Sequence, residues 1–146
     1  MDVNGWALYL HPLLESQIEG LLRKVKQFKN PKKRRAHPAT KLLATINRYI
    51  QEIIPRDPNA PEFRQGNTLG PENRHWFRAK FHRRFRLFYR FSSKHKVIVY
   101  AWVNDESTLR KRGGKTDPYT VFRSMLEKGN PPQFFEELLK IQPPRT

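Results

Sequence analysis

The chain contains no cysteine among its 146 residues. Thiol catalysis, disulfide bonds and thiolate-ligated metal sites are therefore excluded, and the absence is typical of proteins from a reducing cytosol. Long hydrophobic runs are also missing. The longest apolar run, residues 97–103, is much shorter than the roughly 18 residues of a membrane span. No secretion signal pattern follows Asp2. We therefore expect a cytoplasmic protein that has no membrane partner.

Acidic residues are scarce: 13 Asp and Glu stand against 29 Lys and Arg, which gives a net charge of +16. No carboxylate occurs between Glu72 and Asp105, an interval that is rich in arginine and lysine. A dense field of one sign attracts polyanions and speeds their arrival. The charge pattern therefore favours a nucleic-acid ligand, with a solvated basic surface or an acidic protein partner as the alternatives.

The length predicts one domain over residues 1–146, with a loose tail at 142–146. Apolar residues recur at steps of three and four over residues 12–28 and 38–53, and a proline begins each segment, which predicts two amphipathic helices. The basic run between them, Lys32–Arg35, is typical of a solvated loop, although an RNA or partner contact is the alternative. The segment up to residue 71, rich in Pro, Asn and Gly, is expected to be a connection within the domain.

Strands are predicted over residues 5–11, 77–82, 84–91 and 97–103, and the last is apolar on both faces, as a central strand is. In the second and third strands apolar and cationic residues alternate, apart from Phe88. Alternating side chains point to opposite faces of a sheet. Helices follow at residues 117–129 and 133–141. These patterns predict an α+β domain whose four-stranded antiparallel sheet is covered on one face by the N-terminal helices, while the other, basic face stays open.

The stretch from Trp76 to Arg110 resembles the YhaV toxin family in detail, and so do the segments 4–6, 39–44, 115–122 and 129–132. The order strand, helix, helix and three strands resembles the RelE/ParE toxin fold. The resemblance implies the toxin of a type II toxin–antitoxin system, a metal-independent endoribonuclease that needs no cofactor. Such a toxin cleaves messenger RNA, commonly in association with the ribosome, and so blocks translation and growth. It also implies a PrlF-like antitoxin with a swapped-hairpin fold, and binding of the pair to its own promoter DNA.

The resemblance implies attack of a ribose 2′-hydroxyl on the adjacent phosphate, which leaves a 2′,3′-cyclic phosphate. This reaction needs a base, an acid and cations that stabilise the growing negative charge. We expect Arg84 and Arg86 to bind the scissile phosphate, because a guanidinium group can hold two phosphate oxygens. Lys80 is crowded by other cations, which disfavours its charged form and suits it to act as base or acid.

Other residues complete the expected site. Arg110 and Lys115 are predicted to close it from the far side, and Tyr119 to orient a nucleotide or stack on its base. Further RNA contacts are expected from Arg78, His82, Arg83, Arg90 and Asn104. No metal site is expected, because the five histidines are scattered and lack paired acids.

Each assignment has an alternative. Arg86 could instead pair with Asp105 or Glu106, and Asn104 with Asp105 could build a turn. Asp117 is more typical of a helix cap than of a catalytic acid. His75 and His82 have the intrinsic pKa for acid–base work, yet a lone histidine beside arginines is more often a phosphate contact or a surface residue. The three tryptophans are expected in the core, although Trp76 could stack on a nucleotide from the cationic face.

One turn departs from the family pattern. The resemblance implies a glycine-containing turn between the second and third strands, whereas here the turn is His82-Arg83, one residue shorter and without glycine. The family's roles at these two positions are therefore not carried over. Two other functions also stay open: a non-catalytic nucleic-acid-binding protein that uses the same face, and a related toxin aimed at a DNA topoisomerase. The density of phosphate-binding groups weakens the topoisomerase alternative.

Overall fold

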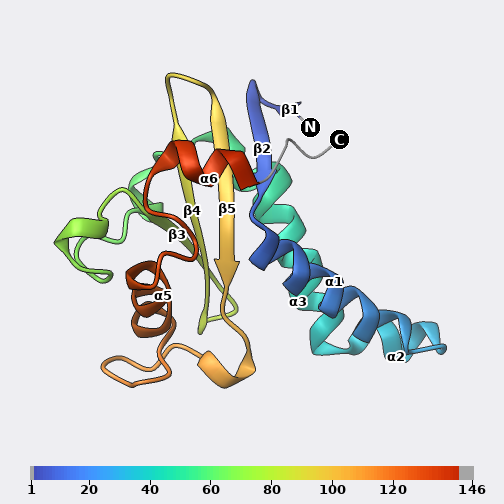
Figure 1. Cartoon of the computed structure of the whole chain (residues 1–146). Coiled ribbons are helices and arrows are strands. Elements are labelled where there is room, and N and C mark those ends of the chain that lie inside the picture. Colours follow the sequence, from blue (N-terminus) through green and yellow to red (C-terminus); the bar gives the residue numbers. More distant parts are fainter. Residues whose placement is uncertain (1, 142–146) are drawn as a thin grey trace.

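The computed structural model describes residues 2–141, so the expected tail at 142–146 lies outside the described residues. A five-stranded sheet in the order β1-β2-β5-β4-β3 carries helices on both faces (Figure 1). Its strands are β1 (Asp2–Val3), β2 (Trp6–Leu10), β3 (Phe77–Phe81), β4 (Phe85–Ser92) and β5 (Val97–Val103). The helices are α1 (Pro12–Lys26), α2 (Pro31–Ala36), α3 (Pro38–Arg48), α4 (Ile54–Arg56), α5 (Pro118–Glu127) and α6 (Phe135–Ile141). The predicted α+β class is confirmed.

Short helical turns complete the chain. A π-helical turn, Tyr49–Ile53, joins α3 to α4, and single 3₁₀ turns lie at Pro61–Phe63, Pro71–Asn73 and Glu106–Thr108. No helix formed by residues 2–141 has both the length and the apolar character to cross a membrane.

Prolines begin the two long N-terminal helices, as predicted. Pro12 and Pro38 each occupy a first-turn position, where the missing backbone N–H costs no hydrogen bond. The histidine before each proline caps the helix: Nδ1 of His11 accepts from the Leu13 amide, and Nδ1 of His37 accepts from the Ala39 amide. The helix starts were therefore readable from local sequence.

The prediction of four antiparallel strands was wrong in two respects. β1 adds a fifth strand beside β2, and β2 runs parallel to β5. The remaining pairs, β3 with β4 and β4 with β5, are antiparallel as predicted. The helices α1 to α4 carry the chain from β2 to β3 at the far edge of the sheet, and two antiparallel pairings then bring β5 beside β2 in the same direction. Side-chain alternation reports which face a residue takes, but it carries no information about strand direction.

The first hydrophobic core lies between the sheet and the N-terminal helices. Leu14 of α1 and Ile46 of α3 are fully buried there. From the sheet they meet the alternate residues of β3 and β4, which include Ala79, Leu87 and Tyr89. These are the positions that the period-two pattern assigned to the helix-covered face, so the predicted packing of two helices on one face is confirmed.

The prediction that the opposite face stays open as a whole was wrong. A second core covers it, formed by α5 and α6 over β4 and β5. Phe88 is fully buried and stacks on Phe122 of α5 with 4.3 Å between ring centroids. Trp76, another fully buried ring, packs edge-on against Phe122. Phe88, the single exception in the alternating pattern, was the signal that a hydrophobic cover exists at this point.

The predicted loop at Lys32–Arg35 was also wrong, because these residues lie within α2. Asn30 caps this helix: its side-chain oxygen accepts from the amides of Lys32 and Lys33. Pro31 then takes the first helical position. The cap and the first-turn proline favour a helix here, although a run of four cations is more typical of a loop.

Candidate active site

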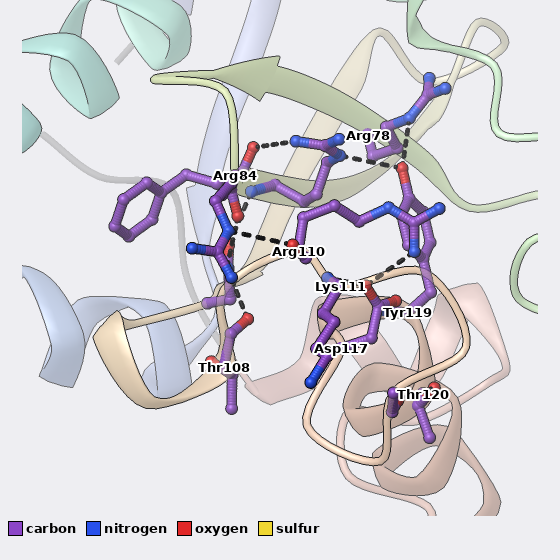
Figure 2. A network of polar contacts seen from close by, with 12 residues as sticks. Arg78, Arg84, Thr108, Arg110, Lys111, Asp117, Tyr119 and Thr120 are labelled. Atoms are coloured by element: carbon purple, nitrogen blue, oxygen red, sulfur yellow. Dashed lines mark hydrogen bonds and ion pairs between the residues drawn. The ribbon is translucent and has the colours of Figure 1, made fainter.

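Cationic side chains gather around Tyr119, a residue that belongs to α5 and to the second core (Figure 2). Lys80 of β3 lies directly opposite Arg86 of β4 in the strand register. Both therefore project from the same face of the sheet. We call the following residues, with Tyr119 at their centre, the cationic cluster: Arg78, Lys80, Arg84, Arg86 and Arg110.

Tyr119 organises the cluster. Its hydroxyl oxygen accepts hydrogen bonds from Nε of Arg78 at 2.8 Å and from Nε of Arg86 at 3.1 Å. The guanidinium carbon of Arg110 lies 4.7 Å from the ring centroid, a cation–π distance. The side chain is buried, with 5% exposure. Tyr119 therefore holds three arginines in place, and one face of its ring is already covered by Arg110.

Arg78 and Arg86 are buried arginines, at 8% and 7% exposure. Arg78 donates Nη1 to the carbonyls of Glu62 and Arg64, and Arg86 donates Nη1 to the carbonyls of Arg83 and Phe85. Backbone carbonyls and the tyrosine hydroxyl thus satisfy these two guanidinium groups without cancelling their charge.

The proposed pairing of Arg86 with Asp105 or Glu106 is absent among the described residues. Arg86 instead donates to the Tyr119 hydroxyl and to backbone carbonyls. Asp105 is engaged elsewhere, because its carboxylate accepts from the hydroxyls of Ser107 and Thr108. The two buried arginines therefore keep their positive charge directed at the cluster.

Lys80 and Arg84 are the exposed members of the cluster. The charge of Arg78 lowers the pKa of Lys80, helped by partial burial and by the charges of Arg86 and Arg110. Arg84 donates Nε to the carbonyl of Arg110 at 3.0 Å, which draws its guanidinium toward the loop before α5. Substrate reaching this surface would meet these two side chains first.

Asp117 anchors that loop and is almost fully buried. One carboxylate oxygen accepts from Nη1 of Arg110 and from the Lys111 amide, both at 2.7 Å. The other accepts from the Tyr119 amide at 3.1 Å and so caps α5. The cap assignment is confirmed, but its ion pair with Arg110 was missed. An acid at a helix cap, seven residues after an arginine, was the available signal.

Asn104 ties β4 to the loop after β5. Its side-chain oxygen accepts from the Arg86 amide, and its side-chain nitrogen donates to the carbonyls of Arg84 and Thr108. Asp105 next to it caps the 3₁₀ turn. The structure therefore shows the turn-building alternative for these two residues, and Asn104 supports the cluster from beneath as a buried residue.

The His82-Arg83 turn adopts a conformation that usually favours glycine. Both residues have positive φ, 45° and 65°, a region that side chains with a Cβ rarely enter. Nε2 of His82 lies 2.8 Å from Oγ1 of Thr45 in α3, which holds the turn against that helix. Both residues are exposed at the rim of the cluster.

Arg90 lies apart from the cluster. Its guanidinium packs over the rings of Trp76 and Phe135 and donates to the carbonyl of Gln133. These contacts fix the segment that leads into α6. His75 lies on the same side: part of its ring is exposed, yet burial of the rest and the charge of Arg90 lower its pKa to about 4.

Lys115 is exposed in the loop before α5, and its ammonium group makes no hydrogen bond or ion pair with residues 2–141. Lys111, which sequence reasoning did not select, is exposed in the same loop and is held by its amide to Asp117. Within the described part of the chain, no group of three or more His, Asp and Glu side chains is arranged to hold a metal ion.

Comparison with known proteins adds a second line of evidence. The family model described as "Toxin with endonuclease activity, of toxin-antitoxin system", Toxin_YhaV, matches residues 8–142. Ribonuclease toxin YhaV of Escherichia coli K12 is 46% identical over 142 residues, covering 94% of this chain and 92% of that protein. Toxin YhaV of E. coli O6:H1 is 47% identical over 140 residues, covering 93% and 91%. No solved structure matches the chain.

Proposed function

We propose that this chain, which belongs to the YhaV family of toxins with endonuclease activity, cuts messenger RNA at the cationic cluster. The observation that carries the proposal is the convergence of three arginines on the hydroxyl and ring of Tyr119, with Lys80 opposite Arg86 in the strand register and Arg84 bound to the Arg110 carbonyl. Among the described residues, the carboxylate that joins them is Asp117, which is bound to Arg110. The remaining positive charge is available to a phosphate group.

The cluster can supply the parts of a metal-independent phosphodiester cleavage. Lys80, in its neutral form, accepts the proton of a ribose 2′-hydroxyl as O2′ attacks the adjacent phosphorus. Arg84 contacts the phosphorane, and the unpaired charge of Arg86 beneath it helps to stabilise the negative charge. The P–O5′ bond then breaks, and the leaving oxygen takes a proton from the ammonium group of the exposed Lys111. The products are a 2′,3′-cyclic phosphate and a 5′-hydroxyl.

The same proposal includes where the toxin acts and which partners it binds. We expect the toxin to act in the cytoplasm on messenger RNA associated with the ribosome, and to be inhibited by a PrlF-like antitoxin. The pair is expected to bind its own promoter DNA through the antitoxin. The strand and helix order supports placing the fold in the RelE/ParE superfamily.

The chemistry of the cut ends tests the proposal. Purified toxin is incubated with messenger RNA, both free and on ribosomes, and the 3′ ends are analysed by mass spectrometry. We expect 2′,3′-cyclic phosphate ends, and a 2′-deoxy nucleotide at the cut position should block cleavage there. Transcripts that stay intact under both conditions would mean that the cluster binds RNA without cutting it.

Removing the charge of Arg78 should move the pH dependence of cleavage. That charge lowers the pKa of Lys80, so its loss lets the pKa rise toward the ordinary lysine value. At a given pH less of the amine is then neutral, and the rate profile shifts to higher pH. We expect this shift in Arg78→Gln and not in Arg78→Lys, measured as single-turnover rate against pH. An identical profile in wild type and Arg78→Gln would contradict the electrostatic link.

A further inference from the structure

A second cationic surface lies away from the cluster. The chain has no Asp or Glu from residue 20 to residue 51. This interval includes the C-terminal half of α1, all of α2 and all of α3. The outer ends of α1 and α3, joined by α2, project beyond the edge of the sheet (Figure 1), whereas Ile46 near the inner end of α3 packs in the first core. We call residues 20–48 the helical arm. Its outer part carries eight cations: Arg23, Lys24, Lys26, Lys29, Lys32, Lys33, Arg34 and Arg35.

The outer part of the helical arm is a folded structure. Asn30 caps α2, and Nε of Arg34 donates to the Phe28 carbonyl at 2.8 Å. The ring of Phe28 lies against that of His37, with 4.4 Å between centroids. These contacts close the turn between α1 and α3. The cations are therefore presented on a defined surface, which lowers the entropy lost when a ligand binds.

The charge of this surface is uncompensated. All of the eight cations except Arg34 are exposed, and none takes part in the ion pairs found within residues 2–141. A surface with so high a density of one sign costs stability through self-repulsion. A fold that keeps such a surface rigid and unpaired is suited to a ligand that carries many negative charges.

The helical arm contacts the hairpin formed by β3 and β4. Thr45 of α3 contacts His82 in the turn between β3 and β4, and Tyr49, the first residue after the arm, donates its hydroxyl to the Lys80 carbonyl at 3.3 Å. At 1.5 Å per residue, Thr45 lies about 12 Å along α3 from His37 at the outer end. A ligand held by the arm is therefore placed at a fixed distance from the cluster.

We propose that the helical arm binds the phosphate backbone of double-stranded RNA, separately from the strand that is cut. The chemistry of the arm distinguishes this ligand from others. Leu22, at 40% exposure, is the exposed large hydrophobic residue of the arm, whereas protein interfaces depend on clustered apolar and aromatic anchors. Single-stranded RNA is held by exposed aromatic rings, and Phe28 is instead packed against His37. Duplex RNA is recognised through its backbone and shape.

This inference rests on the proposed function only in taking RNA as the ligand. Duplex binding by the helical arm and cleavage at the cationic cluster are therefore tested separately. The arm variant is Lys32→Gln/Lys33→Gln/Arg35→Gln, which changes exposed residues and leaves Arg34 in place. Glutamine keeps the helix propensity of lysine and arginine. The matched control, Lys94→Gln/Lys128→Gln/Lys140→Gln, removes the same charge from exposed positions elsewhere. The probe is a fluorescent 2′-O-methyl RNA duplex, which has no 2′-hydroxyl to attack, and its binding is followed by anisotropy at several salt concentrations.

We expect the arm variant to bind the duplex at least about tenfold more weakly at ~0.15 M salt, with a salt slope smaller by about 2–3 for three lost cations. Its cleavage of a short single-stranded RNA should stay within about twofold of wild type. The control triple variant should bind the duplex like wild type, and Arg84→Ala should bind the duplex normally while losing cleavage. Unchanged duplex binding by the arm variant would overturn the inference, and so would an equal loss in the control. Loss of antitoxin binding with duplex affinity intact would assign the arm to a protein partner and overturn it as well.

Discussion

Lys80→Met is expected to slow RNA cleavage by about 10²–10⁴-fold, the range that a positioned general base or acid contributes. Lys80 combines the features that this role needs: its side chain is exposed at the surface, and the charge of Arg78 lowers its pKa. Methionine keeps most of the side-chain length and removes the ammonium group. The measurement is the single-turnover rate on a short RNA that contains one cut site.

Lys80→Arg separates proton transfer from charge. Arginine keeps the positive charge but stays protonated at any working pH, so it cannot serve as a base. We expect this variant to bind RNA almost normally and to cleave nearly as slowly as Lys80→Met. Lys94→Met, an exposed lysine between β4 and β5, provides the matched control and should keep full activity. Wild-type cleavage by Lys80→Arg would show that Lys80 contributes only charge.

Arg84→Ala is the second large effect, with an expected loss of about 10²–10³-fold in cleavage rate, as for the loss of one preorganised oxyanion donor. Arg84 is exposed, and its side chain makes one hydrogen bond, to the Arg110 carbonyl. The fold should therefore survive the substitution. In cells the variant should relieve growth arrest far more than it weakens antitoxin binding, which is measured by growth after induction and by co-purification with the antitoxin.

Arg86→Ala is less informative at the same site. Arg86 is buried, and its guanidinium makes three hydrogen bonds, so removing it leaves partners unsatisfied and weakens the fold as well as catalysis. Arg84→Lys is the better companion, since it keeps the charge and loses the planar fork that holds two phosphate oxygens. Full toxicity of Arg84→Ala would remove Arg84 from the active site.

Much of the site could be predicted because side-chain direction is a local property of a strand. Alternation along β3 and β4 placed Arg78, Lys80 and Arg86 on one face, and the strand register bears this out. The same alternation could not separate buried from exposed cations. Arg78 and Arg86 lie beneath the surface while Lys80 and Arg84 are exposed, because Tyr119 reaches the two buried residues from 41 and 33 positions away in sequence.

The sequence by itself determined the four longer strands and the longer helices of this protein, the faces of β3 and β4 and the positive charge of the region that we assign to RNA, but neither β1 nor α2. These features follow from periodicity, capping residues and composition, which act over a few neighbouring residues. Only the tertiary structure decided the parallel direction of β2 and the hydrophobic cover over part of the cationic face. It also set the ion pair of Arg110 with Asp117 and the projection of the helical arm. These depend on contacts between segments far apart in the chain, whose free energies no local pattern records.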